Sequence, residues 1–289
     1  MKKILALGMT LAMVFSLAAC GSNSQNEKEN DVRPSDANQT EAENTASDDL
    51  SMVMANGKLV IGMTIYEPMN YYDNSGKLIG FDTEYAQAVC AKLGVEPEFV
   101  EINWDTKVVE LDSRSIDCIW NGMTMTEELA QNISFSDPYI KNMQVLVVKK
   151  DNADKFTSTE SLAKGVVAAE AGSAGETAIK DDANLSKATY VSVAKQTDAL
   201  MEVKAGTSDA AVLDYVLAAA MVGEGTDYSD LCMVKGVELS VEEYAIGLRK
   251  GSNLAEKINE ATKELIADGT IAKIAEKYDL TLQLISNQK

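Results

Sequence analysis

A short polar turn after an apolar stretch is the first place in this chain where side chains could contact a small ligand. Residues 116–120 are mostly apolar and predict a strand, which ends in Asn121-Gly122-Met123-Thr124. A glycine at the end of a strand lets a ligand approach the backbone closely, because it has no Cβ atom. We therefore expect the Asn121 amide, the backbone of Gly122 and the Thr124 hydroxyl to face a bound ligand.

A second glycine-containing turn, Gly172-Ser173-Ala174-Gly175-Glu176, follows the apolar residues 166–169 and begins a predicted helix. The N–H groups at the start of a helix can bind an anion without a cationic side chain. Ser173 and Ala174 are therefore candidate ligand contacts. Glu170, which comes just before the turn, either reaches the ligand or is a solvated charge at the rim of the site.

One further acid and two aromatic residues complete the set of candidates. Asp214 follows the stretch 209–213. It either pairs with the ammonium group of a ligand or caps the helix that follows it. Tyr66 and Trp104 each follow a predicted strand, and they either stack on a ligand or belong to the core. Trp120 lies inside an apolar strand and is expected in the core.

The charge and composition of the chain exclude several classes of function. The formal net charge is −19 at pH 7, and there is no histidine. Nucleic-acid binding is not expected, because a phosphate backbone requires clustered Lys and Arg. Catalytic triads, general bases and metal sites that depend on histidine are excluded as well. We expect neither a metal ion nor a cofactor.

The chain has four cysteines, of which Cys20 belongs to the export signal described next. Cys90, Cys118 and Cys232 each lie among apolar residues, which favours buried free thiols. A disulfide between Cys90 and Cys118 stays open, because sequence spacing does not determine the distance between two side chains.

The first residues predict export and attachment to a membrane. Residues 1–19 combine two lysines, an apolar core and small residues, as a secretory signal peptide does. The sequence Leu17-Ala18-Ala19-Cys20-Gly21 resembles a bacterial lipobox, which implies that Cys20 is acylated; an ordinary cleaved signal is the alternative. Residues 20–55 are rich in polar side chains and are expected to form a disordered tether. The protein would then lie on the outer face of the cell membrane, held by its lipid anchor.

From residue 58 onward, predicted strands and helices alternate, which is typical of α/β proteins with parallel sheets. Strands are expected at residues 58–63, 98–102, 116–120, 144–148, 166–169, 189–193, 210–213 and 241–248. Helices are expected at residues 81–93, 105–111, 159–163, 174–180, 197–204, 215–222, 253–268 and 270–278.

The segment from residue 121 to residue 139, NGMTMTEELAQNISFSDPY, resembles the signature of the polar amino-acid-binding proteins of ABC importers, a branch of the periplasmic-type solute-binding family. The resemblance covers essentially all of residues 58–280. The family usually has an arginine that binds the carboxylate of the ligand where this chain has Leu129. A charge-assisted pair of that kind is worth about 1.5–3 kcal/mol per hydrogen bond.

The resemblance implies an α/β, two-lobed fold of the periplasmic-binding-protein type II class, with two hinge crossings near Asn142 and Val241. One lobe would comprise residues 56–142 and 242–289, and the other residues 143–241. An amino acid or a related amine would bind in the cleft between Tyr66 and Trp104, with its ammonium group on Asp214. The protein would be a monomer that delivers this ligand to the permease of an ABC transporter, rather than an enzyme.

Two other classes of function use the same fold and stay open. A periplasmic dehydratase would use an acidic residue as general acid, and Glu170 is placed for that role. The ligand-sensing domain of a receptor is the other alternative. Leu129, together with the acids Glu170 and Asp214, predicts a preference for neutral polar or basic ligands. An acidic ligand would bury an extra carboxylate without a cation to meet it.

Overall fold

The structure is a computed structural model that describes residues 48–287 of the 289-residue chain. The predicted signal peptide, Cys20 and the predicted tether up to residue 47 lie outside the described residues. Among the residues described, no helix is both long enough and apolar enough to cross a membrane.

The first of two five-stranded sheets combines strands from both ends of the chain, in the order β4-β1-β5-β12-β6. Strand β1 pairs in parallel with both β4 and β5, whereas β12 runs antiparallel to β5 and β6. The strands are β1 (Lys58–Met63), β4 (Glu96–Glu101), β5 (Cys118–Ile119), β6 (Ile133–Phe135) and β12 (Gly247–Arg249). The helices that belong to this part are α2 (Phe81–Leu93), α3 (Lys107–Asp112), α4 (Glu127–Asn132), α8 (Leu254–Ala267) and α9 (Thr270–Lys277).

The second sheet has the strand order β11-β7-β10-β8-β9. Strand β8 is parallel to β9 and β10, and β7 is antiparallel to β10 and β11. The strands are β7 (Ile140–Lys149), β8 (Val166–Glu170), β9 (Thr189–Val193), β10 (Ala210–Asp214) and β11 (Leu231–Tyr244). The helices of this part are α5 (Ala174–Asp181), α6 (Gln196–Ala205) and α7 (Tyr215–Met221).

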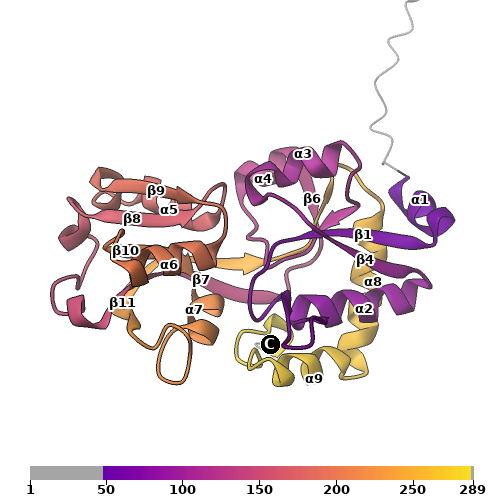
Figure 1. Ribbon diagram of the computed structural model, residues 1–289. Coiled ribbons are helices and arrows are strands. Elements are labelled where there is room, and N and C mark those ends of the chain that lie inside the picture. The colour runs from indigo at the N-terminus through magenta and orange to yellow at the C-terminus, as the bar shows by residue number, and fades with distance from the viewer. Residues whose placement is uncertain (1–47, 288–289) are drawn as a thin grey trace, which may run out of the picture. The chain divides into compact units, whose positions relative to one another are not determined.

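Strands β7 and β11 run between the two halves of the molecule (Figure 1). They pair with each other from Ile140 and Tyr244 at one end to Lys149 and Leu231 at the other. These paired strands are the two crossings that the sequence predicts, and the chain is α/β with mixed sheets. The residue ranges given for the two lobes stay a prediction.

Smaller elements complete the chain. Strands β2 (Tyr71–Tyr72) and β3 (Leu78–Ile79) form a two-stranded sheet. The 3-10 helices are η1 (Trp104–Thr106), η2 (Lys150–Asn152), η3 (Glu160–Leu162), η4 (Leu185–Lys187) and η5 (Ile285–Asn287). The predicted helix at 159–163 is thus a single 3-10 turn, and the predicted strand at 241–248 is divided between β11 and β12.

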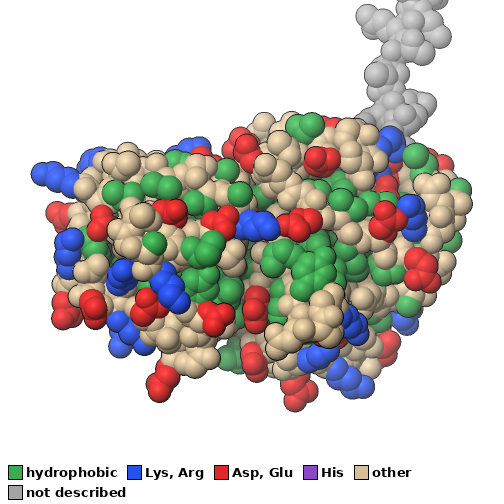
Figure 2. All heavy atoms as spheres, viewed as in Figure 1, with side chains coloured by type: hydrophobic (Ala, Val, Ile, Leu, Met, Phe, Trp, Pro, Cys, Tyr) green, Lys and Arg blue, Asp and Glu red, His purple; other side chains and the backbone are tan. Residues whose placement is uncertain are grey.

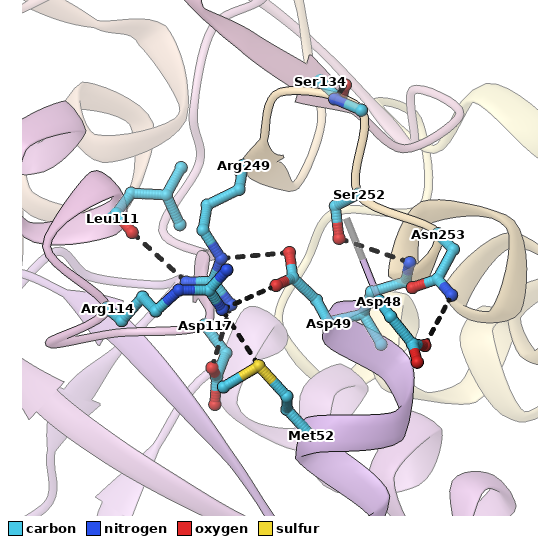
Figure 3. A network of polar contacts seen from close by, with 12 residues as sticks. Asp48, Asp49, Met52, Leu111, Arg114, Asp117, Ser134, Arg249, Ser252 and Asn253 are labelled. Atoms are coloured by element: carbon cyan, nitrogen blue, oxygen red, sulfur yellow. Dashed lines mark hydrogen bonds and ion pairs between the residues drawn. The ribbon is translucent and has the colours of Figure 1, made fainter. Parts of the chain in front are cut away.

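Helix α1 (Asp49–Asn56) corrects the expectation of a disordered tether for residues 49–55 only, since the part of the predicted tether up to residue 47 lies outside the described residues. The side chain of Asp49 is fully buried and pairs with two arginines. Its Oδ2 atom lies 3.0 Å from Nε of Arg249, and its Oδ1 atom lies 2.9 Å from Nη1 of Arg114 (Figure 3). Removing one partner of a buried ion pair is strongly destabilising. These ion pairs therefore attach α1 to the first sheet, and an ordered helix begins earlier than polar composition suggests.

The cysteines of the described residues are free thiols. Cys90 and Cys118 are both buried, and Cys232 is partly exposed. Burial raises the pKa of the Cys90 thiol to about 12, so that it behaves as a small apolar group. The prediction of buried free thiols is confirmed for Cys90 and Cys118, and the alternative, a disulfide between these two residues, is wrong.

Candidate ligand-binding cleft

A cavity of about 470 Å³ lies between the two sheets. Segments that follow the carboxyl ends of β1, β5, β8 and β10 line it, which is where ligands bind in open α/β sheets. A volume of this size is typical of sites for small molecules. All of the residues predicted to bind a ligand contribute to the lining: Tyr66, Trp104, Asn121, Gly122, Thr124, Glu170, Ser173, Ala174 and Asp214.

Gly122 has a backbone conformation and surroundings that exclude a side chain. Its φ is +56°, and a Cβ atom there would lie 2.7 Å from Cε1 of Tyr66. Its N–H donates to Oδ2 of the buried Asp82 at 2.7 Å, and Tyr139 donates to the same oxygen. Burial raises the pKa of Asp82 to about 7. The hydrogen bond to Asp82 therefore fixes the backbone of the turn. Because Gly122 has no side chain, no Cβ atom projects from this part of the cavity wall.

The aromatic side chains at the cleft are also packed into the protein. Tyr66 is 3% exposed, and its hydroxyl lies 2.6 Å from that of Tyr244. Trp104 is 7% exposed and belongs to an apolar cluster. Tyr66 and Trp104 thus both line the cavity and belong to the core, so that the two alternatives are compatible. Trp120 is fully buried and 4.8 Å from the ring of Tyr85, in the core as predicted.

Asn121 lines the cavity, but its amide is fully used inside the protein. Its Oδ1 accepts from both the backbone N–H and the hydroxyl of Thr64, at 3.0 and 2.8 Å. Its Nδ2 donates to the carbonyl of Thr64 and to Oδ1 of Asn70, at 2.9 and 2.7 Å. An asparagine side chain has two donors and two acceptor lone pairs. Asn121 therefore fixes the loop after β1, and its side-chain amide has no donor or acceptor left for a ligand.

Asp214, at the end of β10, and Glu242, on β11, form a pair of carboxyl groups on either side of β7. Asn142 and Gln144 each donate hydrogen bonds to Oδ1 of Asp214 and to Oε1 of Glu242, over distances of 2.6–2.8 Å. Thr124 donates to the same Glu242 oxygen at 2.9 Å. Burial and the nearby charge of Asp214 raise the pKa of Glu242 to about 8. Sequence reasoning missed Glu242.

Asp214 does not cap the helix that follows it. Its carboxylate is 6% exposed, and it makes no side-chain capping bond to α7. Asn142 takes that role, because its Oδ1 accepts from the N–H of Val216 at 3.2 Å. Gln196 donates to the other carboxylate oxygen of Asp214. Three side-chain amides thus hold this carboxylate at the cavity wall.

Glu170 is buried rather than solvated at a rim. Its side chain is 3% exposed, and its Oε1 has no hydrogen-bond partner among the described residues. Burial and the charge of Asp214 raise the pKa of Glu170 to about 8. An unpaired polar atom in the interior is costly, and the described residues do not compensate this oxygen.

The start of α5 forms part of the opposite wall. Ser173 caps this helix, because its hydroxyl accepts from the N–H of Glu176 at 3.2 Å. Glu176 in turn accepts from the N–H of Gly172 at 2.7 Å. The N–H of Ala174, the first residue of the helix, has no acceptor within the helix. The role of Ala174 in binding an anion stays a prediction.

Lys107 supplies a cation that sequence reasoning missed. It is the first residue of α3, lines the cavity and is 6% exposed. In the sequence it is one lysine among many, and only the approach of the two sheets places it in the cleft. Leu129 lines the same cavity and packs against the apolar cluster that contains Trp104 and Met123.

The two parts of the molecule are in direct contact. Lys107 Nζ donates to the carbonyl of Gly172 at 2.8 Å, and Lys195 forms an ion pair with Glu101 at 2.5 Å. A Cβ atom on Gly172 would lie 2.9 Å from Cα of Asp105. At Lys107 and Gly172, this contact between the two parts also lines the cavity. On the face that Figure 2 shows, basic side chains are scattered among acidic ones rather than gathered in one patch.

Known proteins share both the sequence pattern and the fold. The model of the bacterial extracellular solute-binding proteins, family 3, matches residues 59–281. The ABC transporter glutamine-binding protein GlnH of Bacillus subtilis is 31% identical over 286 residues, which cover 96% of this chain and 97% of that protein.

Two solved structures have the same architecture. An ancestral arginine-binding protein bound to arginine is 38% identical, with a TM-score of 0.72 over 77% of this chain and 98% of its own. The ancestral amino acid-binding protein AncCDT-1, a precursor of cyclohexadienyl dehydratase, is 34% identical, with a TM-score of 0.72 over 79% and 98%. The chain therefore belongs to the bacterial extracellular solute-binding proteins of family 3, an amino-acid-binding family of ABC importers with the two-lobed type II fold.

Proposed function

We propose that this protein captures an amino acid with a free ammonium group in its cleft and delivers it to the permease of an ABC transporter. The observation that carries this proposal is the buried carboxylate of Asp214, which three amides hold at the cavity wall and which caps no helix. An ammonium group that enters the cleft would find this acceptor already oriented. The family of ABC importers to which the chain belongs supports the transport role.

The arrangement of the cleft suggests a pose for the bound amino acid. The ammonium group lies on Asp214, and the side chain lies between Tyr66 and Trp104. Glu170 adds an acceptor with an unused oxygen. Neutral polar or basic amino acids are favoured, since an acidic side chain would meet carboxyl groups on this side of the cavity. Relatives named for glutamine and arginine agree with this class of ligand.

Calorimetric titration of an Asp214→Asn variant tests the ammonium site. Removal of one partner of a buried charge pair costs about 3–5 kcal/mol, so binding should fall by two decades or more. Asp181→Asn, which removes an exposed carboxylate from the end of α5, is the matched control and should bind as the wild type does. Equal affinity of the Asp214 variant and the wild type would remove Asp214 from the site.

The anchoring part of the proposal concerns Cys20, which lies outside the described residues. We propose that an acyl chain on Cys20 holds the protein on the outer face of the cell membrane. Cells that express a Cys20→Ser variant should release the protein into the soluble fraction, whereas the wild type should stay with the membrane. A wild type found only in the soluble fraction would contradict the anchor.

A second candidate function follows from Glu170. A buried carboxyl group that keeps its proton near neutral pH can serve as a general acid, and one structural relative is a precursor of a dehydratase. Incubation of the protein with the amino acids that it binds, followed by mass spectrometry, separates the two functions. Unchanged ligands support transport, and a dehydrated product that disappears in a Glu170→Gln variant supports the enzyme.

A further inference from the structure

The ammonium group of Lys107 is buried between the two lobes and has unused bonding capacity. Its Nζ donates to the carbonyl of Trp104 at 3.1 Å and to the carbonyl of Gly172 at 2.8 Å. It also lies 4.8 Å from the centre of the Trp104 ring. A lysine ammonium has three donors, so one N–H remains. Because Lys107 lines the cavity, this third donor has the cleft within its reach.

Lys107 also lacks a charged partner in the described part of the chain. None of the ion pairs between described residues, up to 4.0 Å, includes it. Burial lowers the pKa of Lys107, and the charges of Glu170, Asp105 and Glu176 act in the opposite direction. A buried charge with carbonyl partners alone is poorly compensated. An anion placed beside Nζ would compensate it.

The other lysine of the lining is not equivalent to Lys107. Lys180 has a side chain that is 65% exposed, and it is already paired with Glu176 at 2.8 Å. The position at which the family usually has an arginine holds Leu129, which packs among apolar side chains of the same wall. The described lining therefore offers one buried cation for a carboxylate, and it comes from α3 rather than from α4.

We propose that Lys107 binds the carboxylate of the amino acid through its third N–H, in place of the arginine that Leu129 has replaced. This inference rests on the proposed function and names the group that selects for a free carboxylate. The ammonium of the amino acid on Asp214 and its carboxylate on Lys107 would be bound by opposite lobes. Since Lys107 also donates to Gly172, the bound carboxylate would lie next to a contact that joins the two lobes.

The test compares amino acids with their carboxamides, which lack the carboxylate charge. L-arginine, L-glutamine and L-histidine, each with its carboxamide, are titrated into the wild type, Lys107→Met and Lys180→Met by calorimetry. The wild type should bind at least one amino acid more tightly than its amide. Lys107→Met should lose about tenfold to a hundredfold in affinity for that amino acid and little for the amide. Lys180→Met should keep the preference of the wild type.

A rescue variant distinguishes a ligand contact from a structural role. Leu129→Arg in the Lys107→Met background should restore the preference for the carboxylate, because it returns a cation to the family position. If Lys107 only joins the lobes through Gly172, Lys107→Met will weaken the amino acid and the amide by the same factor, and this overturns the inference. A wild type that binds none of the three amino acids overturns the proposed function, and the inference with it.

Discussion

The pair formed by Glu242 and Asp214 should make the stability of the protein depend on pH. Glu242 is buried and its pKa is raised from 4.5 to about 8 by burial and by the charge of Asp214. The folded protein therefore holds a proton that the unfolded chain has lost between pH 4.5 and 8. The unfolding free energy must then fall as the pH rises through this window, with a slope of up to about 1.4 kcal/mol per pH unit for one proton.

The change across the whole window is on the order of 5 kcal/mol, because each pKa unit corresponds to about 1.4 kcal/mol. Asn142 and Gln144 each donate to both carboxyl groups and hold Glu242 close to Asp214. A Glu242→Gln variant carries an amide in place of the protonated acid. It should lose most of this slope and become more stable than the wild type above pH 8.

Urea unfolding at several pH values between 4.5 and 9 measures the effect. Glu243→Gln, which removes a carboxylate from the next residue of β11, is the matched control and should follow the wild type. Buried Glu170 and Asp82 contribute in the same direction, since their pKa values are raised to about 8 and about 7. Only the difference between the variant and the wild type is therefore assigned to Glu242. Parallel curves for Glu242→Gln and the wild type would refute the reasoning.

Three further outcomes are expected. Arg249→Met should lower the free energy of unfolding by about 3–5 kcal/mol in urea titrations, because the buried Asp49 would lose an ion pair. Gly122→Ala should weaken amino-acid binding in calorimetry and cost about 1–3 kcal/mol of stability, since the added Cβ would meet Tyr66 at a positive φ. The thiol of Cys90 should react with a maleimide only after unfolding, as mapped by mass spectrometry, and labelling of the native protein there would contradict its burial.

The alternation of predicted strands and helices was sufficient to predict an α/β fold, but the expectation of parallel sheets was wrong, because β7, β11, β12 and β6 add antiparallel pairings. The helix at residues 81–93 is observed with the same bounds, because Tyr85 and Val89 lie on one face and Gly94 ends it in the left-handed conformation. The turn at Gly122 could be located as well, since an apolar strand leads directly into it. Local pattern predicts these features because local contacts form them.

Features that depend on distant partners could not be predicted in this way. In β11, the apolar Val241 is 74% exposed and the charged Glu242 is 9% exposed, which is the reverse of what hydrophobicity indicates. Glu242 is buried because amides on β7 bind it. Helix α1 is ordered for a similar reason, since Arg249, far along the chain, pairs with Asp49.

The distribution of charge in the cleft connects these unpredicted residues with the proposed ligand. Among the described residues, the cavity lining contains two buried acids, Glu170 and Asp214, and one buried cation, Lys107. A third buried acid, Glu242, shares its amide donors with Asp214. The buried acids outnumber the buried cations. Because an isolated buried charge is costly, the acids without a cationic partner must be neutralised. Protons on Glu170 and Glu242 neutralise these two acids near neutral pH.

A ligand with more positive than negative charge can neutralise the acids instead, whereas an acidic ligand would add a further negative charge. The replacement of the usual arginine by Leu129 removes a positive charge from the cleft, and the proposed preference for neutral or basic amino acids rests on that balance.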